Sequence, residues 1–175
     1  NDLSLVDKII KKVKEEKVDY LFILGDISDL GELKIDLIKK IIRYIDPKKV
    51  FIVPGNHDSI DLLYLLKEKF GIRIFHKDYI MYSDFALVGL GGGDILLFII
   101  SENEIEEFLK EISKKVKHKR IILFTHLPPK YTKASLNIFG SKSMYNFIKY
   151  VGPELVIYAH IHETGGLEEI LYKTK

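Results

Sequence analysis

The 175-residue sequence contains no cysteine and no tryptophan. Without cysteine there are no disulfide bonds and no thiolate ligands, so any metal ion has to be held by oxygen and imidazole nitrogen atoms. Wholly apolar runs such as Ile95–Ile100 are far shorter than the roughly 20 residues that cross a bilayer. No secretory signal pattern opens the sequence either. We therefore expect a cytoplasmic protein without a membrane partner.

The composition is that of an ordinary globular domain, with 30% charged and 47% hydrophobic residues. A formal net charge of +2 is too small to favour nucleic acid as a partner, although it leaves that alternative open. Abundant Lys, Glu and Ile beside absent Cys and Trp are typical of a thermophile. The length predicts a single domain over residues 1–175. The oligomeric state is not encoded in any pattern that we recognise.

Helical and strand patterns alternate along the chain. Amphipathic spacing predicts helices over residues 3–17, 33–45, 61–69, 101–117 and 141–151. Short buried runs predict strands over residues 20–24, 48–55, 120–126 and 154–162, with several more between 72 and 100. This alternation indicates an α/β fold in which helices bury parallel strands.

Four of these strands end in polar residues that can bind metal ions. The first is followed by Asp26 and Asp29, the second by Asn56 and His57, the third by His126, and the last contains His160 and His162. Each motif by itself is better explained as a turn or a solvated loop. Because ligands bind beyond the carboxyl ends of strands in α/β sheets, the repeated pattern predicts that the four tips meet at one site.

The donor types indicate which metals fit. Carboxylate, amide oxygen and neutral imidazole suit Mn²⁺, Fe or Zn²⁺ better than Ca²⁺. A carboxylate can bridge two cations, which in two-metal sites lie about 3.5–4 Å apart. Alternation along a strand places His160 and His162 on the same side, which allows one imidazole for each metal.

The ordered motifs resemble those of the calcineurin-like metallophosphoesterases. They are Gly25-Asp26-Ile27-Ser28-Asp29, Gly55-Asn56-His57-Asp58, Thr125-His126 and Ala159-His160-Ile161-His162. The resemblance covers residues 1 to about 167, and the loop sequences are most similar to the small Icc-related phosphoesterases of archaea and bacteria. It implies a four-layer α/β/β/α sandwich with the metals between the strand tips.

The resemblance also implies a role for each motif residue. Asp26 is expected to bridge two divalent metal ions, with Mn as the first choice and Fe, Zn, Ni or Co as alternatives. Asn56, His126 and His160 complete the second metal site, and His162 belongs to the first. Asn56 and His57 contact the substrate, His57 protonates the leaving oxygen, and Asp29 orients His57. A metal-bridging hydroxide then attacks phosphorus.

The sequence departs from the family pattern in three places. The family opens with D-x-H, and the first ten residues here resemble the stretch that follows it, so we expect the chain to lack the N-terminal strand carrying that motif. Ala159 stands where glycine is usual. The family's closing N-P-G strand is also not found, so C-terminal strands are expected to be missing as well.

Two classes of function remain open. The favoured one is a binuclear metal-dependent phosphoesterase acting on small phosphoesters, with phosphodiesters preferred. A phosphoprotein phosphatase is disfavoured, because Leu30 stands where such enzymes carry a phosphate-binding arginine and Asp58 replaces their glutamate. The alternative is a non-catalytic scaffold that keeps the fold and binds a protein partner. Lys130, Tyr131 and Lys133 are candidates for substrate contact, although a solvated loop explains them equally well.

Overall fold

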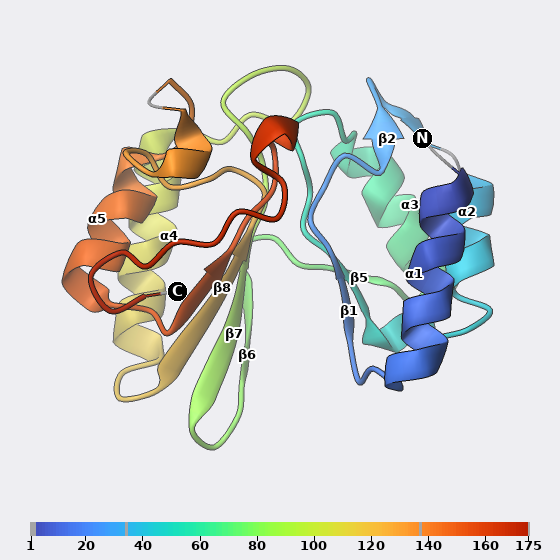
Figure 1. Ribbon diagram of the computed structural model, residues 1–175, viewed down its shortest axis with the longest axis horizontal. Helices are drawn as coiled ribbons and strands as arrows, with labels where there is room; N and C mark the ends of the chain where they lie inside the picture. Colours follow the sequence, from blue (N-terminus) through green and yellow to red (C-terminus); the bar gives the residue numbers. More distant parts are fainter. Residues whose placement is uncertain (1–2, 34, 137, 175) are drawn as a thin grey trace.

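The computed structural model describes residues 3–33, 35–136 and 138–174. Two β-sheets lie face to face, and helices cover the outer side of each, so that the layers run helix, sheet, sheet, helix (Figure 1). The four-layer α/β/β/α sandwich expected from the sequence is therefore confirmed. None of the helices in these ranges is long and apolar enough to cross a membrane.

The first sheet has three parallel strands in the order β1-β4-β5. Its members are β1 (Leu21–Ile23), β4 (Val50–Ile52) and β5 (Arg73–Ile74). The helices α1 (Leu3–Glu16), α2 (Ile35–Ile41) and α3 (Ile60–Phe70) cover its outer face (Figure 1). Their apolar stripes, with Val6 and Ile10 on α1 and Leu63 on α3, form one core cluster with this sheet. Burial of these stripes, more than helix propensity, stabilises the helices.

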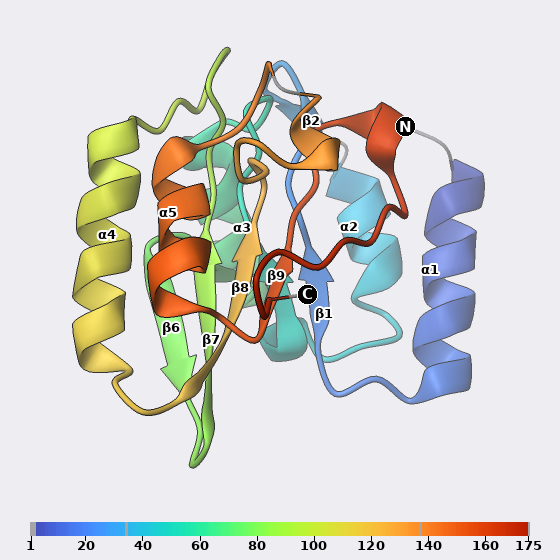
Figure 2. The same ribbon diagram turned by 60° about the vertical axis from the view of Figure 1, so that its left-hand side comes forward.

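The second sheet has the order β6-β7-β8-β9. Its strands are β6 (Asp78–Met81), β7 (Phe85–Leu90), β8 (Arg120–Thr125) and β9 (Leu155–Ile157). The β7, β8 and β9 strands are parallel, whereas β6 pairs antiparallel to β7, so the expectation of parallel strands holds only for part of this sheet. The helices α4 (Glu102–Lys115) and α5 (Lys142–Val151) pack on its outer face, as Figure 2 shows.

Several local predictions are confirmed at the helix ends. Ser101 and Glu104 form the reciprocal capping box that starts α4. Gly71 ends α3 in the left-handed conformation, with φ +75°. The helix predicted over 33–45 is shorter, because β3 (Glu32–Leu33) pairs with β2 (Ser28–Asp29) in a small hairpin before α2 begins. Residues 1 and 2 lie outside the described ranges. They begin the stretch that resembles the sequence after D-x-H.

Aromatic rings join the two sheets. Phe22 on β1 stacks on Phe124 on β8, with ring centroids 3.9 Å apart and an interplanar angle of 8°. Phe51 on β4 also stacks on Phe22, with ring centroids 4.9 Å apart. Leu87 and Phe75 complete the buried layer. The stack fixes how the β1 tip lies against the β8 tip, because both rings are close to those tips.

Candidate metal centre

The loops after β1 and β4 meet through the carboxylate of Asp58. Its Oδ2 accepts hydrogen bonds from the backbone N–H groups of Asp26 and Gly55, both at 2.9 Å. Its Oδ1 accepts from the backbone N–H of Ser28 at 2.9 Å and from the Ser28 hydroxyl at 2.8 Å. Asp58 is fully buried. This charge-assisted network orders both loops and holds Asp26 beside the β4 tip.

Asp26 adopts a left-handed backbone conformation, with φ +54°. Its Oδ1 accepts the backbone N–H of His57 at 3.1 Å, and its Oδ2 lies 3.4 Å from Nε2 of His126. There is no room for a side chain on Gly55, since an added Cβ would collide with the Asp26 carboxylate and would lie 2.5 Å from its backbone nitrogen. The close approach of the strand tips therefore requires glycine at residue 55.

His126 follows β8 and is almost completely buried. Its Nδ1 lies 2.8 Å from the carbonyl oxygen of Leu24, which can only accept a hydrogen bond. Nδ1 therefore carries the hydrogen, and in the neutral ring Nε2 is an unprotonated acceptor. That Nε2 lies 3.0 Å from Oδ1 of Asn56. The ring is thus held in the tautomer that a metal ligand requires.

His160 comes from beyond the end of β9, and its backbone is left-handed with φ +72°. Its Nε2 lies 3.4 Å from Oδ1 of Asp94, and its Nδ1 lies 3.1 Å from Oδ1 of Asn56. Burial, and then the neighbouring His126, lower the pKa of His160 below its usual value. This shift favours the neutral ring, and the Asp94 carboxylate beside Nε2 directs the remaining N–H away from the cluster.

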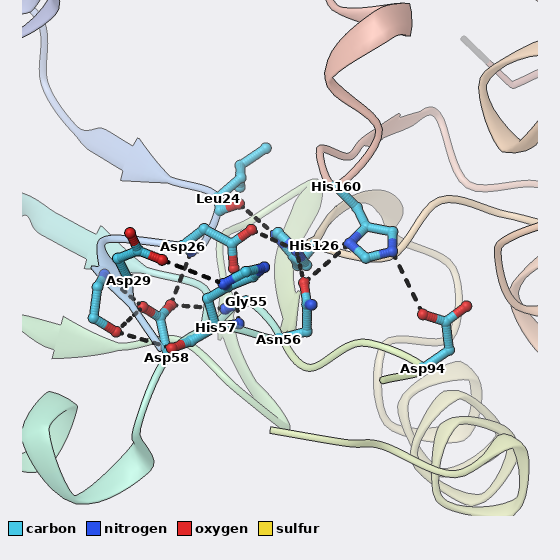
Figure 3. Close-up of polar contacts among 11 residues, drawn as sticks. Leu24, Asp26, Asp29, Gly55, Asn56, His57, Asp58, Asp94, His126 and His160 are labelled. Carbon is cyan, nitrogen blue, oxygen red and sulfur yellow. Dashed lines mark hydrogen bonds and ion pairs between the residues drawn. The ribbon is translucent and has the colours of Figure 1, made fainter. Parts of the chain in front are cut away.

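Four acceptor atoms consequently face one another: Asp26 Oδ2, Asn56 Oδ1, His126 Nε2 and His160 Nδ1 (Figure 3). The measured separations run from 3.0 to 3.4 Å, including 3.2 Å between the two imidazole nitrogens. Ligand atoms about 2.1 Å from one cation and subtending about 90–110° are about 3.0–3.5 Å apart. The donor set and its spacing therefore fit one divalent cation.

This fit depends on the amide oxygen of Asn56. Among the described residues, no group of three or more His, Asp or Glu side chains is arranged by itself to hold a metal ion. Asn56 lies within hydrogen-bonding distance of both imidazoles and is 2% exposed. The amide oxygen joins the two imidazoles and the Asp26 carboxylate into one cluster, and an oxygen ligand of this kind suits the same cations.

In Figure 3, Asp29 lies on the other side of Asp26 from His160, and the His57 ring lies beside the Asp26 carboxylate. His57 Nδ1 is 3.8 Å from Asp29 Oδ1, which is an ion-pair distance rather than a hydrogen bond. Both side chains are at the surface of a cleft of ≈ 560 Å³ that also reaches Asp26, Asn56 and His160. His57 is therefore accessible to a ligand that occupies the cleft.

His162 does not lie where the strand pattern predicted. The β9 strand ends at Ile157, and His162 begins a short 3-10 turn, His162–Thr164. Since His160 has a left-handed backbone, alternation is interrupted, and the prediction that His160 and His162 share one side of a strand is wrong. His162 is exposed and lines the same cleft, without being in the four-atom cluster.

Two residues to which the sequence analysis gave no structural role support the site. Asp58 was named there as the last residue of the motif at positions 55–58, and Asp94 follows the glycine-rich run Gly91–Gly93. The carboxylate that follows such a close-packed run is the one available signal for Asp94. In contrast, Lys130, Tyr131 and Lys133 do not line the cleft: the Lys133 amide bonds to Glu169, and Tyr131 packs edge-on against Tyr145.

The family model of the calcineurin-like phosphoesterases matches residues 2–164. The chain belongs to this family, whose members generally use divalent metal ions. The match covers nearly the whole chain, and the cluster of carboxylate, amide and imidazole groups lies within the matched part.

Named relatives are more distant. An uncharacterized protein of Methanocaldococcus jannaschii is 30% identical over 179 residues, which cover 95% of this chain and 81% of that protein. A Coxiella burnetii protein named "Probable cyclic nucleotide phosphodiesterase" is 23% identical over 154 residues, covering 82% of this chain and 60% of that protein. The crystal structure of TT1561 of Thermus thermophilus superposes with a TM-score of 0.67 at 20% identity, over 91% of this chain and 76% of that one. This last likeness concerns the fold alone.

Proposed function

We propose that the protein is a binuclear metal-dependent phosphoesterase that hydrolyses phosphodiesters. Asp26, Asn56, His126 and His160 hold one divalent cation, for which Mn²⁺ is the first choice. Asp26 would also be a ligand of the second cation, together with His162, which lines the cleft. The observation that carries this proposal is the convergence of four acceptor atoms at 3.0–3.4 Å with no donor hydrogen among them.

A cluster of this kind is electrostatically unfavourable without a positive charge at its centre. The neutral tautomer of His126 is imposed by Leu24, and that of His160 by Asp94. Neither Nε2 of His126 nor Nδ1 of His160 therefore has a hydrogen to donate to Asn56. A divalent cation supplies the missing charge and satisfies all four atoms together.

When bound, the cations supply Lewis-acid activation of water and neutralise charge on the phosphoryl oxygens. The protein's own part is positioning and proton transfer. Asn56 and His57 contact the phosphate from the β4 loop, and Asp29 orients the His57 ring. His57 donates a proton to the leaving oxygen, because its imidazole lines the cleft next to Asp29 and outside the acceptor cluster.

The reaction consumes one water molecule. Its oxygen forms a new bond to phosphorus while one ester P–O bond breaks, and the leaving oxygen takes the bonding electron pair and the proton from His57. A proton from the water restores His57. The products are an alcohol and a phosphate monoester. The name of the Coxiella burnetii relative makes a cyclic nucleotide one substrate to assay.

The test is hydrolysis of bis(4-nitrophenyl) phosphate by protein stripped of metal with EDTA and then desalted. We expect no hydrolysis by the stripped protein, recovery on addition of Mn²⁺, and at least one Mn per chain by elemental analysis. His118→Ala is the matched control, because His118 is exposed and does not line the cleft. Metal binding without hydrolysis of any diester would favour the non-catalytic scaffold. Hydrolysis that is equally fast with and without metal would refute the metal-dependent phosphoesterase.

A further inference from the structure

Large apolar side chains form one wall of the cleft. Ile95 contributes from the 93–100 loop after β7, and Leu136 and Phe139 contribute from the loop between β8 and α5. In the first of these loops, residues 95–97 and 99 are between 45% and 59% exposed. A single exposed apolar residue is ordinary, but several on two loops that border one cleft indicate a binding surface.

Backbone hydrogen bonds fix both loops. The N–H groups of Leu97 and Phe98 donate to the carbonyl oxygen of Asn56 at 3.0 and 3.2 Å, so the first loop is tied to a residue of the acceptor cluster. The N–H of Phe139 donates to the carbonyl oxygen of Ser135 at 3.0 Å, and Ser135 is fully buried. An apolar wall held in this way loses little conformational entropy when a ligand packs against it.

The charges around the cleft disfavour a highly anionic ligand. Its lining includes the carboxylates of Asp26, Asp29 and Glu163, and none of the described lining residues is Lys or Arg. A polyphosphate or a nucleic-acid backbone needs a cationic side chain for each additional phosphate. The proposed cations would neutralise one phosphate, and the described lining residues offer no lysine or arginine side chain for a second.

Part of the wall lies beside His160. Ile95 is adjacent in the chain to Asp94, and the Phe139 ring lies edge-to-face with the His160 ring at a centroid distance of 6.0 Å. In Figure 3, Asp94 and His160 are at one end of the drawn residues and Asp29 is at the other. Because His57 Nδ1 is 3.8 Å from Asp29 Oδ1, the leaving group that His57 protonates lies toward Asp29, and the ester group that stays on phosphorus lies toward Phe139 beside His160.

We infer that the substrates are phosphodiesters with a single negative charge whose retained ester group is apolar, such as an alkyl chain. This inference rests on the proposed function and adds the chemical class that the cleft selects. The hydrolysis step is unchanged, so the apolar group leaves the site as part of the phosphate monoester.

Three dissolved esters with the same 4-nitrophenol leaving group test the inference. They carry a methyl group, a hexyl group or thymidine (through its 5′ oxygen) as the retained group. Because the hexyl chain has five more methylenes to place against the wall, we expect its kcat/KM with Mn²⁺ to exceed that of the methyl ester about ten-fold. The esters are used well below the concentration at which the hexyl ester aggregates.

Variants of the wall residues test whether the wall causes the preference for the hexyl ester. Ile95→Ser and Phe139→Ala are each expected to lower the hexyl-to-methyl ratio from about ten to below about three. Ile170→Ser is the matched control, because Ile170 is 74% exposed and does not line the cleft, and its ratio should equal that of the unmodified protein. Ile95→Ser changes an exposed loop residue and should leave folding intact.

Each other result would overturn the inference in a recognisable way. Equal, Mn²⁺-dependent hydrolysis of the methyl and hexyl esters would refute the apolar class and leave the proposed function standing. A preference for the thymidine ester would favour a nucleoside group instead. If the hexyl ester is preferred only when it is aggregated, the two loops bind the surface of the aggregate rather than a single dissolved substrate molecule. Hydrolysis of none of the three would refute both proposals.

Discussion

The backbone N–H of Asp26 donates a hydrogen bond of 2.9 Å to the buried carboxylate of Asp58, although the two residues are 32 positions apart. The same carboxylate accepts from Gly55 and, twice, from Ser28. Asp58 therefore fastens the loop after β1 to the loop after β4. The two loops carry Asp26 and Asn56, so their relative position depends on one buried side chain.

Asp58→Asn should destabilise the protein and lower its activity together. The amide has only one acceptor oxygen, and its NH₂ group would face N–H donors, so hydrogen bonds to a charged acceptor are lost in a buried place. We expect the free energy of unfolding, measured by urea denaturation, to fall by about 3 kcal/mol. Asp19→Asn at an exposed position should change it by less than about 0.5 kcal/mol. An equally small change for Asp58→Asn would contradict the fastening role.

His57→Ala and His126→Ala should both abolish diester hydrolysis, for different reasons. His126 belongs to the acceptor cluster, so its removal should lower the Mn content per chain. His57 is placed to donate a proton rather than to bind metal, so its removal should leave the Mn content unchanged. Elemental analysis of both variants after Mn²⁺ reconstitution makes the distinction, and equal metal loss in the two would refute the role proposed for His57.

Asp94→Ala should weaken metal binding without removing a ligand. Asp94 lies 3.4 Å from Nε2 of His160 and directs its Nδ1 toward the cluster. Loss of such a carboxylate partner typically lowers metal affinity about ten-fold or more. The measurement is the Mn²⁺ concentration that gives half-maximal activity, with Asp94→Asn expected to restore part of the loss because its amide oxygen can still accept. An unchanged Mn²⁺ requirement in Asp94→Ala would count against the positioning role.

His76 should make stability depend on pH. Burial, and then the adjacent Lys77, lower the pKa of His76 to about 4. Its Nδ1 accepts the backbone N–H of Gly91 at 3.1 Å, which requires an unprotonated nitrogen. Between pH 6.5 and 4 the unfolded chain binds a proton that the folded chain does not, so folded stability decreases as the pH falls through this window.

We expect this histidine to contribute a loss of about 2.5 kcal/mol in unfolding free energy between pH 6.5 and pH 4. In His76→Asn the amide oxygen can accept the Gly91 N–H at any pH, so the decrease should be smaller by that amount. His118→Asn alters an exposed histidine and should keep the full decrease. Identical pH profiles for the two variants would show that His76 titrates normally in the folded protein.

Local patterns predicted most of the elements, because burial of an apolar stripe needs only neighbouring residues in the chain. The Ser101 capping box and the Gly71 helix end are local in the same sense. The prediction failed at β9, where Tyr158–His162 continues an apolar run but the left-handed His160 ends the strand pairing. A backbone reversal of this kind is set by what packs against it and leaves no periodic signal.

The same division between local patterns and long-range packing applies to the site. The sequence identified Asp26, Asn56, His126 and His160 as residues at strand ends, because their chemical types and order are visible without coordinates. It did not identify Asp94, whose contact with His160 joins positions 66 residues apart in the chain. The partners that set imidazole tautomers are often backbone carbonyls or single carboxylates, which no short motif marks.

The sequence by itself determined which donor types were available. Without cysteine, a metal can only meet oxygen and imidazole, and four strands end in such groups. Only the tertiary structure decided that these tips meet, because β1 and β4 belong to one sheet while β8 and β9 belong to the other. The stack of Phe22 on Phe124 sets the position of one sheet against the other and thereby brings Leu24 to His126. That contact fixes a tautomer, and it depends on packing between distant segments that no local pattern encodes.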